Sequence, residues 1–216
     1  MHMISGLRKS AVALAAGASL FLAASQAQAV PVFSGPVNIA IPSNNLDGIY
    51  LNVLTGVSGT SGMPGGVAGW DINPFGTTNL RFFSATPLLS SGYAGVGTAI
   101  SNLALGASVG ATSTFINATA APAASIWNLN SSNNFVGFRF LNEGADLVSP
   151  ADDTVHYGYF QIALGTNTFT GRSIVGYAFE SVPGASITVV PEPGTYALMG
   201  LGLAGLLLAT RRRKQA

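Results

Sequence analysis

The chain has 216 residues, a formal net charge of +1 and a charged fraction of only 8%, against about 25% in ordinary soluble proteins. It contains no cysteine, which excludes disulfides, thiolate metal sites and cysteine nucleophiles. Between residues 30 and 190 there are three arginines and seven acidic residues, so this part carries a net charge of about −4. A nucleic-acid-binding protein needs a basic patch, so we expect no nucleic-acid partner.

The N-terminus has the pattern of a secretory signal peptide. Arg8 and Lys9 precede the apolar run Ala11–Ala24, and the small residues Ala27 and Ala29 stand at the usual cleavage positions. A transmembrane helix would need about 18–20 apolar residues, and this run is shorter. We therefore predict that residues 1–29 are removed by signal peptidase.

Residues 30–189 are predicted to form an all-β fold, a single antiparallel β-sandwich of the jelly-roll type. Five short segments rich in β-branched and aromatic residues are bounded by Gly, Asn, Asp or Pro. They are residues 49–53, 80–83, 135–141, 155–164 and 173–179. No segment here has a helical period, and the stretches 56–69 and 84–124 resist assignment.

Alternation within the strands predicts which side chains enter the core. Val136, Phe138 and Phe140 share one face and Arg139 lies on the other, so the first face should be buried. The segment 165–171 has turn residues at both ends and predicts a hairpin to the strand that follows.

Aromatic residues could form a surface on which a sugar stacks, since such a ring offers an apolar face and a polar edge. The candidates for this glycan contact are Trp70 with its neighbour Asp71, Trp127, Tyr50, Tyr93 and Tyr159. Trp70 and Asp71 lie in a turn-rich setting and are the best candidates for an exposed site. The alternative is that these aromatics are core residues.

Acidic residues gather in the loop that follows the 135–141 strand. Glu143, Asp146, Asp152 and Asp153 could hold Ca²⁺ through carboxylate and backbone oxygens. The spacing of a calcium-binding loop motif is missing, so the alternative is a solvated acidic loop. We therefore predict no obligatory cofactor, with Ca²⁺ as the one candidate.

The sequence offers little for catalysis. Glu143 and Glu180 are the only glutamates between residues 30 and 190, and nothing in the pattern brings them together as a glycosidase requires. His156 is the only histidine there and has no nucleophile motif nearby. We expect a non-enzymatic protein, with a secreted hydrolase as the less favoured alternative.

The C-terminal segment has three parts in a fixed order. Pro191, Glu192 and Pro193 hold the chain extended, and the uncharged run 194–210 follows. As a helix this run measures roughly 25 Å, enough to span a membrane with mild thinning. The last part is a basic stop that should remain cytoplasmic, made of Arg211, Arg212, Arg213 and Lys214.

The motif at 191–193, the apolar helix and the basic stop together resemble the PEP-CTERM sorting domain of Gram-negative bacteria. The resemblance covers residues 190–216 and implies recognition by a membrane-embedded exosortase, cleavage near the Pro-Glu-Pro motif, and export to the cell surface or an exopolysaccharide matrix. The precursor would be anchored in the inner membrane until then. A plain C-terminal anchor is the alternative reading.

A second resemblance concerns the predicted domain. The segments 41–42, 47–52, 69–74, 135–140, 156–159 and 176–180 look like the recurring segments of an uncharacterised group of exported domains that often carry this tail. It implies no activity. We therefore predict a structural or adhesive role in a biofilm matrix, or alternatively a lectin-like surface module.

Overall fold

A computed structural model describes residues 29–62, 66–84, 91–116, 124–143 and 152–191. These residues form predominantly antiparallel β-sheets, and the one helical element among them is a short 3-10 turn, η1 (Ala124–Ile126). Every strand pair is antiparallel. The described residues thus confirm the predicted all-β class.

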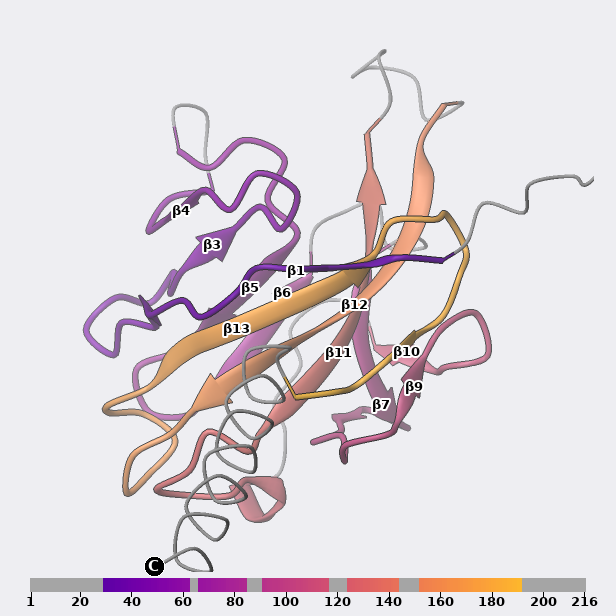
Figure 1. Ribbon diagram of the computed structural model, residues 1–216. Coiled ribbons are helices and arrows are strands. Elements are labelled where there is room, and N and C mark those ends of the chain that lie inside the picture. The colour runs from indigo at the N-terminus through magenta and orange to yellow at the C-terminus, as the bar shows by residue number, and fades with distance from the viewer. Residues whose placement is uncertain (1–28, 63–65, 85–90, 117–123, 144–151, 192–216) are drawn as a thin grey trace, which may run out of the picture.

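The largest sheet is built around three long neighbouring strands, β11, β12 and β13 (Figure 1). Its path is β1 (Pro31–Phe33), β13 (Ser173–Glu180), β12 (Thr154–Ala163), β11 (Phe135–Asn142), β7 (Gly92–Val96) and β10 (Phe115–Ile116), with β2 (Ile39–Ala40) beside β13 and β8 (Ala99–Ile100) beside β7. The hairpin predicted at 165–171 connects β12 to β13, as expected.

Two smaller sheets complete the described strands. One has four strands in the order β4 (Ser58–Gly59), β3 (Tyr50–Leu51), β5 (Ile72–Phe75) and β6 (Arg81–Ser84). The other pairs β14 (Ile187–Thr188) with β9 (Ser108–Val109). In Figure 1 the four-stranded sheet lies on one side of the long strands and β9 on the other.

The main hydrophobic cluster lies between the large sheet and the four-stranded sheet. Leu51, Ile72 and Phe82 from the small sheet meet Phe138 and Phe160 from the large one. All five side chains are completely buried, and full burial of each contributes about 1.5–3 kcal/mol. Val136 and Phe140 belong to the same cluster, which confirms the predicted core face of this strand.

A second cluster covers the opposite face of the large sheet. Tyr157 and Tyr159 of β12 pack there against Val109, Ile187 and Val189, which come from the segments of β9 and β14. The long central strands are therefore buried on both faces. Arg139 lies on this second face, with its guanidinium carbon 4.8 Å from the ring centroid of Phe115.

Candidate functional site

An aromatic row lies on the outer face of the four-stranded sheet. Trp70, just before β5, contacts Tyr50 edge-to-face with ring centroids 4.9 Å apart and lies 5.9 Å from Phe83. Tyr50 and Trp70 are half-buried, and 36% of Phe83 is exposed. This row places Trp70 at the centre of three rings, although the sequence interpretation did not include Phe83.

Three of the predicted glycan contacts are core residues instead. Trp127 is only 7% exposed and packs against Phe82 in the main cluster. Tyr159 is 4% exposed in the second cluster, and the buried Tyr93 lies in the first. Because both faces of the large sheet are covered, these rings have no free face on which a sugar could stack.

Asp71 points inward, away from its neighbour Trp70. Its carboxylate accepts a hydrogen bond of 2.7 Å from the backbone N–H of Val53, and the residue is 7% exposed. Burial, and to a smaller degree the nearby carboxylate of Glu143, raises the pKa of Asp71 to about 7, and the hydrogen bond from Val53 partly opposes this rise. The structure thus brings together two acidic residues that flank strands of different sheets, Asp71 before β5 and Glu143 after β11, a proximity that the sequence interpretation did not predict.

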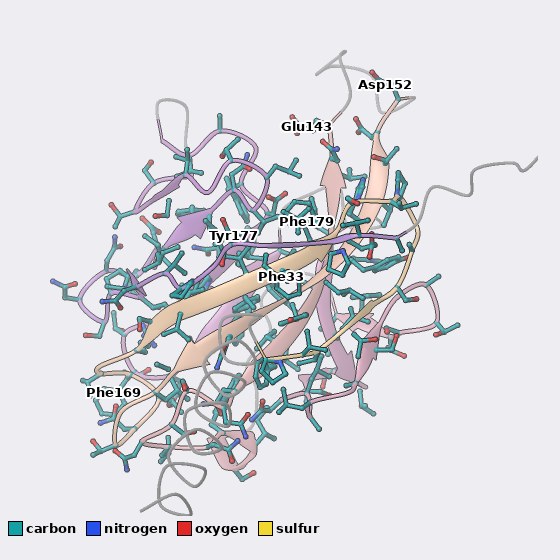
Figure 2. The ribbon with its side chains drawn as sticks, viewed as in Figure 1. Phe33, Glu143, Asp152, Phe169, Tyr177 and Phe179 are labelled. Atoms are coloured by element: carbon teal, nitrogen blue, oxygen red, sulfur yellow. The ribbon has the colours of Figure 1, made fainter. Side chains whose placement is uncertain are left out.

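The acidic loop starts where β11 ends. Figure 2 shows Glu143 and Asp152 at the same end of the molecule, opposite the hairpin that carries Phe169. Asp146 lies outside the described residues, so the predicted calcium-binding set cannot be assembled from them. Within the described ranges, no three His, Asp or Glu side chains are grouped closely enough to hold a metal ion.

His156 and Glu180 are both held by hydrogen bonds near the end of β13. The Nδ1 atom of His156 lies 2.7 Å from the carbonyl oxygen of Glu180, and Nε2 lies 3.0 Å from the hydroxyl of Thr154. The carboxylate of Glu180 accepts hydrogen bonds from Ser181 and from the backbone of Val182. Glu180 is 1% exposed, so both residues are engaged inside the fold.

The end of the described chain is held by backbone hydrogen bonds beyond β14. The N–H of Val189 donates to the carbonyl of Ala107, and the N–H of Gly106 donates to the carbonyl of Val189, each over 2.8 Å. Val189 itself is completely buried. The chain therefore remains part of the folded structure as far as Val189, the residue before Val190.

The hydroxyl of Tyr159 holds the next residue. It donates a hydrogen bond of 2.9 Å to the carbonyl of Val190 and accepts one of 3.3 Å from the N–H of the same residue. The ring of Tyr159 packs edge-to-face against Phe135, with centroids 6.1 Å apart. We call this arrangement of Tyr159 and Val190 the C-terminal clamp.

Pro191 follows the clamp and lines a surface depression of about 410 Å³. The other lining residues carry no charge and come from several parts of the large sheet and its loops: Leu105, Ser132, Asn133, Phe135, Gln161 and Val175. Pro191, the last described residue, is therefore surrounded by a neutral, mixed polar and apolar surface.

Comparison with families of known proteins decides the nature of this segment. Residues 189–214 match the PEP-CTERM protein-sorting motif. The match confirms the resemblance noted in the sequence and implies an exported protein that exosortase processes at the membrane. No curated protein and no solved structure matched the chain.

The sorting motif overlaps the folded structure. Val189, Val190 and Pro191 belong both to the matched segment and to the described residues. Outside the described residues lie the predicted signal peptide up to residue 28, Glu192 and Pro193, the uncharged run and the predicted basic stop at 211–214. Within the described ranges, no helix is long and apolar enough to cross a membrane.

Proposed function

We propose that this chain is a non-enzymatic protein that exosortase sorts to the cell surface or exopolysaccharide matrix of a Gram-negative bacterium. There it has a structural or adhesive role in the biofilm. The sorting motif at residues 189–214 carries the proposal. Signal peptidase removes residues 1–29, and the uncharged run then anchors the precursor in the inner membrane with Arg211 to Lys214 on the cytoplasmic side.

The folded part serves this role as a stable exported module. We propose that it is one jelly-roll-like sandwich spanning residues 30–189. The packing of the four-stranded sheet on the large sheet supports this architecture. A chain without cysteine has to obtain its stability from such a core, because disulfides are not open to it.

The engagement of the acid–base side chains supports a non-enzymatic role. His156 uses both ring nitrogens inside the fold, and Glu180 is tied to its own turn. Asp71 has a pKa suited to proton transfer, but its carboxylate is buried and bonded to Val53. Turnover of any glycoside or ester in a broad panel, abolished by Glu143→Gln or Glu180→Gln, would contradict this part of the proposal.

Processing is tested on protein recovered from the surface of cells that do and do not contain an exosortase. Mass spectrometry of the C-terminus should find residues 211–214 missing only in the first case. Glu192→Ala should reduce processing, whereas the same substitution at Glu143, an exposed glutamate outside the motif, should not. Surface protein that always retains residues 211–214 would leave a plain membrane anchor.

A second candidate function is glycan binding by the aromatic row. Tyr50, Trp70 and Phe83 place three rings side by side on a partly exposed sheet face. Such rings bind sugars through their apolar faces, with polar ring edges available for hydrogen bonds. The role would be lectin-like and would serve adhesion to the exopolysaccharide.

A glycan array tests this candidate. Trp70→Ala should abolish any binding, while Trp127→Phe, which alters the other tryptophan of the chain inside the core, should leave it unchanged. A chelator in a parallel array tests whether Ca²⁺ held by Asp146, Asp152 and Asp153 contributes. Wild-type protein that binds no glycan would rule out the lectin-like role.

A further inference from the structure

The folded part and the membrane-length run are separated by very little chain. Only Pro191, Glu192 and Pro193 stand between the clamped Val190 and the uncharged run 194–210. Three extended residues reach roughly 11 Å. In the anchored precursor proposed above, the neutral depression around Pro191 therefore lies close to the membrane.

The C-terminal clamp determines which part of this segment an enzyme can bind. A protein that binds an extended segment does so largely through main-chain hydrogen bonds. The backbone groups of Val189 and Val190 are already bonded to Gly106, Ala107 and Tyr159. Binding both Val189 and Val190 would require breaking four hydrogen bonds and exposing the buried Val189, whereas Pro191 is partly exposed and lies outside these bonds.

We propose that the C-terminal clamp delimits the sorting reaction, so that the enzyme acts on the chain from Pro191 onward and the mature protein keeps Val190 docked on Tyr159. This inference rests on the proposed function. The reaction breaks one peptide bond: the acyl carbon passes to water or to another hydroxyl or amine nucleophile, and the tail leaves with a protonated amine. Tyr159 is a positioning residue here and takes no part in that chemistry.

The substitution Tyr159→Phe tests the hydrogen bonds of the clamp separately from the packing of the ring. It removes the hydroxyl that bonds Val190 and keeps the ring that packs on Phe135. Tyr157→Phe is the matched control, because Tyr157 lies on the same strand and in the same cluster, with its ring stacked on Phe115, but its hydroxyl makes no hydrogen bond to Val190.

The experiment starts from full-length chains produced with an exosortase. The C-terminus of the recovered protein is measured by intact mass before and after treatment with a carboxypeptidase. Wild type and Tyr157→Phe should end at Pro191 or later and should retain Val190 after treatment. Tyr159→Phe should lose Val190 roughly thirty times faster, the factor expected when two hydrogen bonds of ordinary strength are removed.

Amide hydrogen exchange on the wild-type protein provides a second measurement that does not depend on how a variant folds. The N–H of Val190 should be protected in the mature protein, and that of Val189 more strongly, because it is bonded to Ala107 in the interior. Rapid exchange at Val190 would overturn the inference.

The outcomes separate the two proposals. A processed wild-type chain that ends at Val190 or earlier overturns the clamp inference and leaves exosortase sorting intact. If wild type and Tyr159→Phe lose Val190 at the same rate, the clamp inference is overturned and exosortase sorting is again unaffected. A chain that always retains its basic stop overturns the proposed function, and the clamp inference with it.

Discussion

Tyr93 of β7 donates a hydrogen bond of 2.8 Å to the carbonyl oxygen of Phe83 in β6. One buried side chain of the large sheet thereby reaches the backbone of the four-stranded sheet. The same hydroxyl accepts a bond of 3.0 Å from the N–H of Asn73 in the neighbouring strand β5. Tyr93 is 1% exposed, and burial raises its pKa. The two sheets are thus joined by directed bonds as well as by apolar packing.

Tyr93→Phe should lower the free energy of unfolding by about 1–3 kcal/mol, because it leaves buried backbone groups without this partner. Denaturant unfolding measures the loss. Tyr177→Phe is the control: Tyr177 lies in the same cluster, and its hydroxyl makes no hydrogen bond with another described residue. Equal losses in the two variants would show that the hydroxyl of Tyr93 contributes nothing specific.

The long strands were predictable because their sequence alternates. Val136, Phe138 and Phe140 face one cluster as their spacing indicates. β7, with the sequence Gly-Tyr-Ala-Gly-Val, was not predictable, because its packing demands small residues rather than an alternating pattern. A Cβ atom on Gly95 would lie 2.3 Å from the carbonyl oxygen of Ala99. Close backbone approach of this kind has no signal in hydrophobic periodicity.

The candidate sites were predictable to different degrees. Trp70 lies on a partly exposed face, as its turn-rich surroundings suggested. Trp127 and Tyr159 are buried because two layers cover the large sheet, which a single sequence does not reveal. The proximity of Asp71 and Glu143 depends on how two separate sheets meet, so no local pattern could have indicated it.

Gly158→Ala should destabilise the large sheet. A Cβ atom at this position of β12 would lie 2.5 Å from the ring of Phe138 on the paired strand and 2.7 Å from the carbonyl oxygen of Ala178. Overpacking of this kind costs about 1–3 kcal/mol. Thermal or denaturant unfolding measures it. Phe138→Leu in the same chain should recover part of the loss, and strictly additive losses would contradict a clash with the ring.

Arg172 is a buried cation held by carbonyl groups. Its guanidinium donates to the carbonyls of Ile41, Pro42, Thr168 and Gly76, and the residue is 3% exposed. Because lysine cannot reproduce this fork of donors, Arg172→Lys should cost at least one hydrogen bond to a charged group, about 1.5–3 kcal/mol.

The matched control for this change is Arg81→Lys. Arg81 is exposed, with its guanidinium carbon 6.0 Å from the ring centroid of Phe75. Replacing it should change the free energy of unfolding by less than about 0.5 kcal/mol. Denaturant unfolding of both variants decides the matter. Similar values for the two would mean that the carbonyl contacts of Arg172 add little.

Asp71 should make the stability of the fold depend on pH. Its pKa rises from 3.8 to about 7 on folding, chiefly through burial, so the folded state retains the proton over this range while the unfolded state loses it. The free energy of unfolding therefore falls as the pH rises from about 4 to 7 and is level outside that window. The charged or titratable groups near Asp71 are Glu143, Tyr93 and Tyr177.

Asp71→Asn should remove this dependence, because the amide stays neutral and its oxygen can still accept the N–H of Val53. At ~1.4 kcal/mol per pH unit, the variant should gain up to roughly 4 kcal/mol over wild type above pH 7 and nothing below pH 4. Unfolding at a series of pH values measures the difference. Asp47→Asn, at an exposed carboxylate, should leave the wild-type curve in place. A gain for Asp71→Asn that is constant with pH would show that the carboxyl is not protonated in the folded state.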